Sequence, residues 1–194
     1  MLMCAVAAFA LLPGYALSAD RKKFIQTLIH AARLRTQKLE LYDPAYRQIA
    51  YPMGDVPEGR GVCTDVVIRA YRAAGVDLQV LVHQDMSKNF ALYPKLWGMR
   101  GTDRNIDHRR VPNLQTFFRR QGAQLAIGKT PQAFKPGDLV TWMLPGNRPH
   151  IGIVSDRYAP DKKTPLILHN IGLGSVEDDI LFEFTITGHY RYHP

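Results

Sequence analysis

The sequence predicts an α+β fold in which N-terminal helices pack on a small antiparallel sheet. Two observations support this prediction. Apolar residues recur at helical spacing up to about residue 122, and short apolar runs separated by Pro, Gly, Asn and Asp follow from about residue 134. Helices that precede the strands, instead of alternating with them, favour antiparallel pairing. A chain of 194 residues suits one domain with its own core, and no repeat or linker divides it.

Residues 1–19 form an uncharged run of apolar and small side chains that ends in "ALSA". This pattern is typical of a secretory signal with a cleavage point near its end, although no Lys or Arg precedes the run. Pro13 and Gly14 interrupt it, which makes it a poor membrane span. We therefore expect a signal peptide over 1–19, a single domain over 20–194, and a periplasmic or secreted protein. An uncleaved membrane anchor and a buried helix are the alternatives.

Four helices are predicted ahead of the strands. The first takes its apolar face from Ile25, Leu28, Ile29 and Ala32, and the second is ended by Gly75. The predicted ranges are 20–41, 63–74, a helix from about 78, and 114–121 with Gly122 as its C-cap. The Pro- and Gly-rich segment 42–59 is expected to be an ordered loop with a short strand at 47–51, and 101–114 a polar loop.

The strands follow a "KPGD" turn. Its Pro-Gly pair punctuates the chain before the apolar run "LVTWML". Three further runs, "HIGIVSDRY", "PLILHNIG" and "FTITGHYRYH", are short, rich in β-branched or aromatic residues, and separated by turn residues. We expect them to pair as neighbouring antiparallel strands.

Two cysteines occur, Cys4 and Cys63. Removal of a signal peptide would leave Cys63 alone, without a partner for an intramolecular disulfide. A lone thiol in an exported protein is either a reactive group or a small buried apolar side chain. Cys63 stands at the predicted start of the second helix, where free N–H groups and the helix dipole stabilise a thiolate.

A nucleophilic thiol also needs a base and a group that orients that base. His150 opens one predicted strand and His169 ends the next, and adjacent antiparallel strands bring such residues within contact range. Each His on its own would be expected only to hydrogen-bond at a strand end. The joint arrangement predicts Cys63 as nucleophile, His150 as base and His169 as orienting residue.

The motifs around Cys63, His150 and His169 resemble those of known protein families. "VCTDVVIRAYRAAG", "KPGDLVTWMLPGNRPHIGIVSD" and "LILHNIG" resemble the cysteine, histidine and third motifs of the NlpC-type cell-wall peptidases, a bacterial branch of the papain-like fold. "YPMGDVPEGRGVCTDVVIRAYR", "DLQVLVHQDM" and "NIDHRRVPNL" look more closely like a bacterial family called domain of unknown function 1287. That resemblance covers residues 41–194.

The resemblance implies a papain-like or NlpC-like fold and an exported cysteine hydrolase. It implies attack on an amide or peptide bond, as in peptidoglycan stem peptides, through a thioester and a triad of Cys63, His150 and His169. Asn170, next to His169, is the alternative orienter. Related families act on other amides, esters or lipids. No metal or cofactor is expected, because the sequence has no closely spaced Cys/His ligand cluster.

Further residues are candidates for substrate binding. Tyr51, or Tyr46, stands in the upstream loop where NlpC-type sites often place an oxyanion-binding Tyr. Asp55 is a candidate to bind a substrate amine, with a capped turn as the alternative. Asp65 follows the nucleophile closely and is a further candidate.

The crowded loop "DRNIDHRR" offers another set of candidates. Its Asp107, His108 and Arg109 are either part of a solvated surface loop or part of a substrate site. In the second case Arg109 or Arg110 would clamp a carboxylate.

The formal net charge of +8 and a pI near 9.6 favour an anionic partner. We expect a monomer acting on peptidoglycan or another anionic cell-envelope polymer. The sequence has no helix-turn-helix, RNA-binding strand signature or zinc spacing, so nucleic acid is not expected. Two alternatives to the hydrolase remain: a non-catalytic wall-binding protein on the same scaffold, and an amidase or acyltransferase with another substrate.

Overall fold

The computed structural model describes residues 14–194, with side chains from residue 19 onward. Cys4 and most of the predicted signal segment lie outside these residues. The first helix, α1 (Gly14–Arg35), runs without a break through the predicted boundary between residues 19 and 20. It ends six residues before the predicted end at residue 41. No helix within residues 14–194 combines the length and the apolarity that a membrane crossing needs.

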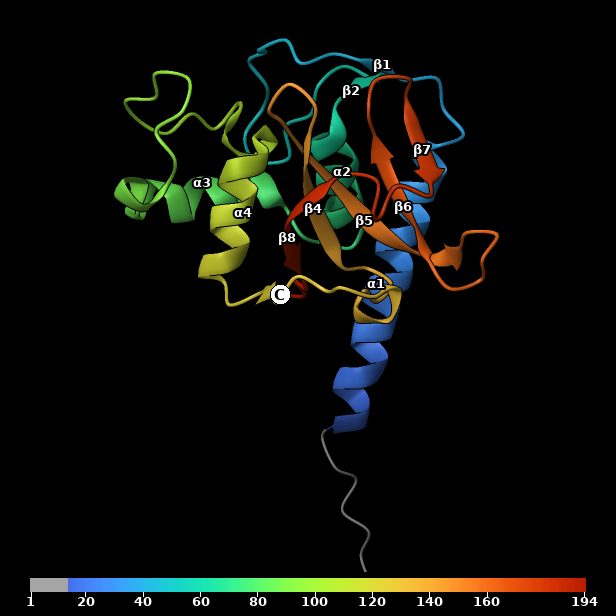
Figure 1. Cartoon of the computed structure of the whole chain (residues 1–194). Coiled ribbons are helices and arrows are strands. Elements are labelled where there is room, and N and C mark those ends of the chain that lie inside the picture. Colours follow the sequence, from blue (N-terminus) through green and yellow to red (C-terminus); the bar gives the residue numbers. More distant parts are fainter. Residues whose placement is uncertain (1–13) are drawn as a thin grey trace, which may run out of the picture.

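The centre of the molecule is a six-stranded sheet in the order β3-β8-β4-β5-β6-β7 (Figure 1). All of its pairings are antiparallel, as predicted. The strands are β3 (Gln124–Leu125), β4 (Leu139–Leu144), β5 (Arg148–Tyr158), β6 (Pro165–Asn170), β7 (Ser175–Asp178) and β8 (Thr185–Tyr190). The short strands β1 (Leu41–Tyr42) and β2 (Arg60–Gly61) form a separate parallel pair. The α+β class is therefore confirmed.

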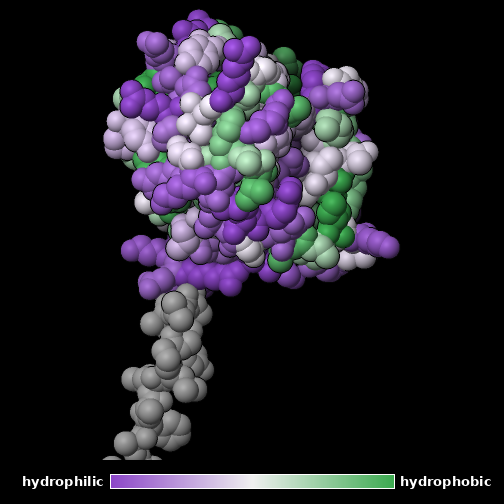
Figure 2. Space-filling view, turned by 90° about the vertical axis from the view of Figure 1, so that its left-hand side faces the viewer, coloured by the Kyte–Doolittle hydropathy of each residue, from purple (hydrophilic) through white to green (hydrophobic). Residues whose placement is uncertain are grey.

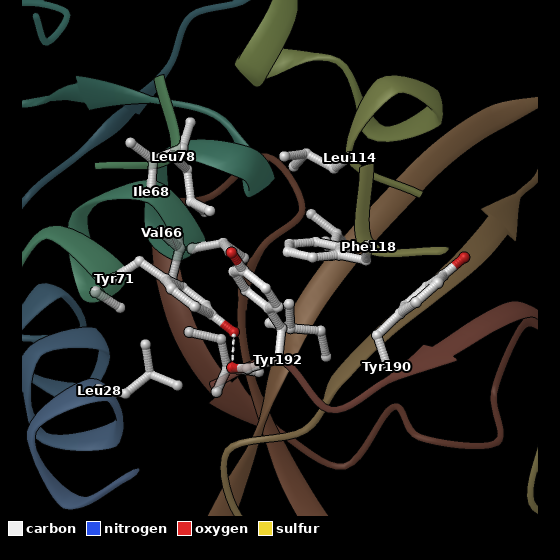
Figure 3. Packing of buried hydrophobic residues seen from close by; sticks show 14 of the residues in the cluster. Leu28, Val66, Ile68, Tyr71, Leu78, Leu114, Phe118, Tyr190 and Tyr192 are labelled. Carbon is white, nitrogen blue, oxygen red and sulfur yellow. Dashed lines mark hydrogen bonds between the residues drawn. The ribbon is translucent and has the colours of Figure 1, made fainter. Parts of the chain in front are cut away.

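Helices cover one face of this sheet. These are α1, α2 (Cys63–Ala73), α3 (Leu78–Lys88) and α4 (Val111–Arg120). The short helices η1 (Phe90–Leu92) and η2 (Asp107–Arg109) lie between α3 and α4, and η3 (Pro131–Ala133) lies between β3 and β4. Leu28 of α1, Tyr71 of α2 and Phe118 of α4 pack together in the core between helices and sheet (Figure 3). The Tyr71 hydroxyl donates to the Tyr192 carbonyl at 2.9 Å, so the one polar atom of that ring is satisfied.

The other face of the sheet carries a second, smaller core. Trp142, Val154 and Ile167 point to this side and are fully buried beneath the segment around Leu181. The Trp142 indole N–H donates to the Leu181 carbonyl at 3.0 Å, which fixes the covering segment. Because both faces are buried, the central strands read as continuous apolar runs in the sequence.

Two loop predictions were wrong. Residues 47–51 form no strand, because the upstream loop pairs through β1 and β2 instead. The segment 101–114 is not a solvated loop: it contains η2 and the start of α4, and Asp107, His108 and Arg109 are buried.

Hydrophilic side chains cover most of the molecular face on the α3 and α4 side, with smaller apolar areas between them (Figure 2).

Candidate active site

Cys63 is the first residue of α2, as predicted. Val62 before it is extended, with φ −128° and ψ −176°, and the Asp65 carboxylate accepts from the Val62 N–H at 2.7 Å. A carboxylate that reaches back over the first turn in this way fixes the start of a helix. The N–H groups of Cys63 and Thr64 lie in the first turn, where no intrahelical carbonyl is available to them.

The Cys63 thiol lies at the Ile151 N–H of β5. The Val154 N–H donates to the Asp138 carbonyl at 2.8 Å on the β4 side, so the N–H groups of Ile151 and Ile153 point toward β6. Pairing between the two strands reaches Ile153 and stops there. The Ile151 N–H, left without a β6 partner, faces the Cys63 sulfur and favours its thiolate.

His150 and His169 contact each other directly. His150 Nε2 lies 3.1 Å from His169 Nδ1, the two rings are nearly perpendicular at 87°, and both side chains are buried. The prediction that neighbouring strands bring these residues together is confirmed. Strand pairing sets His150 opposite Trp142, whose ring packs against the imidazole with a centroid distance of 5.9 Å.

The thiol and the His pair come from opposite faces of the sheet. Trp142, and therefore His150, lies on the face away from α2, whereas Cys63 reaches the sheet from the α2 side. The sulfur lies at the Ile151 N–H, which follows His150 in the chain, whereas the His150 imidazole points to the other face. Within residues 19–194, no hydrogen bond joins the Cys63 sulfur to His150.

Burial sets the protonation state of this group. It raises the pKa of the Cys63 thiol to about 12, against the opposing effect of the Ile151, Thr64 and Cys63 N–H groups. Burial also lowers the pKa of His150 to about 3 and that of His169 to about 4. The resting site therefore holds a neutral thiol and two neutral imidazoles, and the same burial disfavours the charged groups that proton transfer from Cys63 to His150 would create.

Cys63 lies at the wall of a pocket of about 370 Å³. The pocket is largely apolar and aromatic, with two arginines. Its other lining residues are Tyr42, Pro44, Tyr46, Val62, Trp97, Ile106, Arg109, Arg110, Val111, Pro112 and Pro149. Its size and mixed lining suit a small organic group or a short peptide.

Tyr42 is the site residue that the sequence did not reveal. Burial, followed by the electrostatic effect of Cys63, raises the pKa of Tyr42 to about 12, and the two residues line the same pocket. Tyr42 owes this position to the two-residue strand β1. A strand of that length has no periodicity to detect, and its pairing partner lies beyond a long loop.

The predicted substrate residues Asp65 and Arg109 bind each other. Arg109 Nε and Nη2 donate to the two Asp65 oxygens at 2.9 Å each, and both side chains are about 3% exposed. Arg109 lines the pocket, but its fork is already occupied by a carboxylate. This buried pair ties η2 to the first turn of α2 and so supports the position of Cys63.

Two predicted substrate residues from the upstream loop, Tyr51 and Asp55, do not line the pocket. Asp55 accepts a two-point interaction from Arg69, at 2.8 and 3.0 Å. The Tyr51 ring packs edge-on against His83 at a centroid distance of 5.4 Å. Tyr46 does line the pocket, and its hydroxyl donates to the Asp103 carboxylate at 2.9 Å.

Asp107, His108 and Asn170 are fully buried and do not line the pocket. Burial raises the pKa of Asp107 to about 6 and lowers that of His108 to about 3. Asn170 accepts from the Gly172 N–H at 3.1 Å, and its Nδ2 has no partner within the described residues. His169, and not Asn170, is therefore the residue in contact with His150.

No group of three or more His, Cys, Asp and Glu side chains is arranged to hold a metal ion in the part of the chain that the structure describes.

The fold and the site together define an α+β protein with a thiol at a helix start, two bonded histidines at adjacent strand ends, and a pocket at the thiol. Residues 29–192 match the family described as "Domain of unknown function (DUF1287)". A relative from Escherichia coli (strain K12), described as "Uncharacterized protein YijF", is 54% identical over 161 residues, covering 83% of this chain and 78% of the relative. The chain belongs to this family, as its motifs predicted.

Proposed function

We propose that this protein is an exported cysteine hydrolase that cleaves an amide or peptide bond in peptidoglycan stem peptides. One observation carries the proposal: Cys63, at the start of α2, lines a pocket and lies at the Ile151 N–H of β5, and the neighbouring residue His150 is hydrogen-bonded to His169. A nucleophile, a base and a group that orients the base are the parts that acyl transfer to a thiol requires.

The chemistry follows from the neutral resting site. The His150 imidazole contacts His169 on the other face of the sheet. It must turn toward the thiol to take the Cys63 proton as the sulfur attacks the substrate carbonyl carbon. The carbonyl oxygen becomes an oxyanion, for which the Cys63 N–H and the Tyr42 hydroxyl are donors. Collapse expels the amine, which takes the proton from His150. Water, deprotonated by His150, then hydrolyses the thioester and frees the thiol.

Motif resemblance supports the substrate class and the fold family. The order Cys63, His150, His169 is similar to that of NlpC-type peptidases, and α2 packed on an antiparallel sheet is the arrangement expected of a papain-like fold. A net charge of +8 would concentrate the protein on anionic envelope polymers. The uncharged N-terminal run supports export to the periplasm or beyond.

A second candidate is a non-catalytic protein that holds cell-wall peptides in the same pocket. The raised pKa of Cys63 favours it, because a thiol held neutral is a weak nucleophile unless the base acts on it. The two candidates differ in what Cys63→Ala does: it abolishes turnover in the first and leaves binding unchanged in the second.

The test is digestion of purified muropeptides by wild type, Cys63→Ala and His150→Ala, with His30→Gln on the exposed surface of α1 as the control. Mass spectrometry would identify new termini and any acyl adduct on Cys63 after an acid quench. We expect cleavage by wild type and by the control, none by Cys63→Ala, and a loss of about 10²- to 10⁴-fold for His150→Ala. Tight muropeptide binding by all four proteins without cleavage would support the binding protein instead.

A further inference from the structure

Arg110 and Trp97 form a unit at the pocket beside Cys63. The Arg110 guanidinium lies over the Trp97 ring, with its central carbon 4.7 Å from the ring centroid, and both residues line the pocket. Stacking on an aromatic face holds a guanidinium in place while its N–H edges stay available. Within the described residues, the Arg110 side chain makes no hydrogen bond and no ion pair.

The pocket is short of negative charge. None of its lining residues is an Asp or Glu. Arg109, the other cation of the lining, is occupied by Asp65. Asp103 and Asp107 lie close enough to feel the charge of Arg110, but the Asp103 carboxylate accepts from Tyr46 and Asn105, and burial raises the pKa of Asp107. Arg110 is thus the cation of the lining that remains available to a ligand.

We propose that Arg110, held by Trp97, is a specificity-determining residue that selects substrates with a carboxylate close to the scissile carbonyl. The proposal rests on the proposed hydrolase and narrows its substrates. A planar guanidinium binds a carboxylate through two parallel hydrogen bonds, which gives orientation as well as affinity. The apolar wall of Val62, Pro112 and Pro149 would cover the aliphatic part of the same substrate. A substrate with a free amine at that place would be repelled by the Arg110 guanidinium.

The test uses two alkylating reagents that differ mainly in charge. Iodoacetate carries a carboxylate one bond from the reacting carbon, and iodoacetamide is its neutral counterpart. Both react with the thiolate, so the ratio of their rates at Cys63 cancels any change in the pKa of the thiol. Rates would be measured by mass spectrometry of the Cys63 peptide in wild type, Arg110→Gln, Arg110→Lys and Arg148→Gln. Arg148 is the matched control, because it stands two residues before His150 but does not line the pocket.

We expect wild type to favour iodoacetate over iodoacetamide relative to a free cysteine in solution. Arg110→Gln should lower the rate ratio about fivefold and leave the iodoacetamide rate unchanged, whereas Arg148→Gln should change the ratio less than about twofold. Arg110→Lys should keep part of the preference, since it keeps the charge without the fork. Added salt should reduce the wild-type preference.

An unchanged ratio in Arg110→Gln, with normal iodoacetamide labelling, would overturn the inference and leave the proposed hydrolase standing. An equal fall of the rate ratio in Arg148→Gln would also overturn the inference, because the preference would then come from the overall positive charge of the protein and not from Arg110. Failure of both reagents to label native Cys63, with full labelling after denaturation, would instead count against the proposed hydrolase, and the inference would fall with it.

Discussion

Two buried histidine clusters lie on the same face of the sheet, at opposite ends of its central strands. The first is the His150–His169 pair, where β5 begins and β6 ends. The second joins His189, near the end of β8, to Asp138, just before β4 begins, and to Arg191. Both clusters are made of residue types that enzymes use, so composition alone does not separate them.

Their hydrogen bonding does separate them. Asp138 accepts from His189 at 2.8 Å, from Arg191 at 2.6 and 2.8 Å, and from the Lys135 N–H at 2.9 Å. The other His189 nitrogen meets the Ala126 carbonyl at 3.3 Å. By contrast, His169 Nε2 is buried and has no partner within the described residues. A saturated network stabilises a fold, whereas an unsaturated one beside a thiol and a pocket keeps groups free for chemistry.

The largest expected effect is the loss of activity when Cys63, next to the first cluster, is replaced. Cys63→Ala should abolish hydrolysis, by roughly 10⁴-fold or more, because no other nucleophile lines the pocket at that position. Its free energy of unfolding should change by only about 1 kcal/mol, since a small side chain is lost from a site that already opens into a pocket. Muropeptide turnover and urea unfolding would measure the two quantities. Residual turnover above a few per cent would contradict the assignment of Cys63 as nucleophile.

The second expected effect falls on stability alone. Asp138→Asn removes the negative charge that Arg191 and the Lys135 turn depend on, and should cost about 3 kcal/mol of unfolding free energy. Activity per folded molecule should stay close to wild type, because the pocket lies at the other end of the sheet. Urea unfolding followed by activity below the transition would measure both. A variant that is fully stable but inactive would reverse the comparison and make the Asp138 cluster the functional one.

The sequence predicted more of the first cluster than of its surroundings. Helix faces and strand runs follow from periodicity, and Cys63, His150 and His169 each stand near the end of an element. Chain order was therefore enough to place Cys63 at the start of α2 and His150 against His169. Asp65 and Arg109 pair across 44 residues, and nothing in the loop "DRNIDHRR" signals that its charges are buried by that distant partner. A charge-rich segment is expected to be exposed to solvent unless the residues that pair with its charges are known.

A third prediction uses pH to distinguish the clusters. The folded protein holds His150 and His169 neutral, with pKa values of about 3 and 4 against an ordinary value of 6.5. Their contribution to stability is present above pH 6.5 and is lost as pH falls toward the folded values, with a slope of up to about 1.4 kcal/mol per pH unit for each group. The lowered pKa of Asp138 acts only below its ordinary value of 3.8.

The double variant His150→Gln/His169→Gln should therefore flatten the loss of stability between about pH 6.5 and 4. Asp107 has the opposite sign, because its raised pKa of about 6 gives stability that is lost as pH rises through that value. Its contribution is common to wild type and variant, so it cancels in the difference between them. Urea unfolding at half-unit pH steps would provide both curves. Parallel curves would mean that the His pair is not buried in its neutral form.

The smallest expected effect compares two tyrosines of one pocket. Tyr42 lines the pocket with Cys63 and its hydroxyl makes no hydrogen bond within the described residues, whereas the hydroxyl of Tyr46 is bound to Asp103. Tyr42→Phe should lower kcat by roughly tenfold to hundredfold with little change in KM, because an oxyanion donor acts only in the transition state. Tyr46→Phe, the matched control, should change kcat by less than about threefold. Equal losses in both variants, or a loss confined to KM, would mean that Tyr42 contributes to substrate binding and that the Cys63 N–H is the main oxyanion donor.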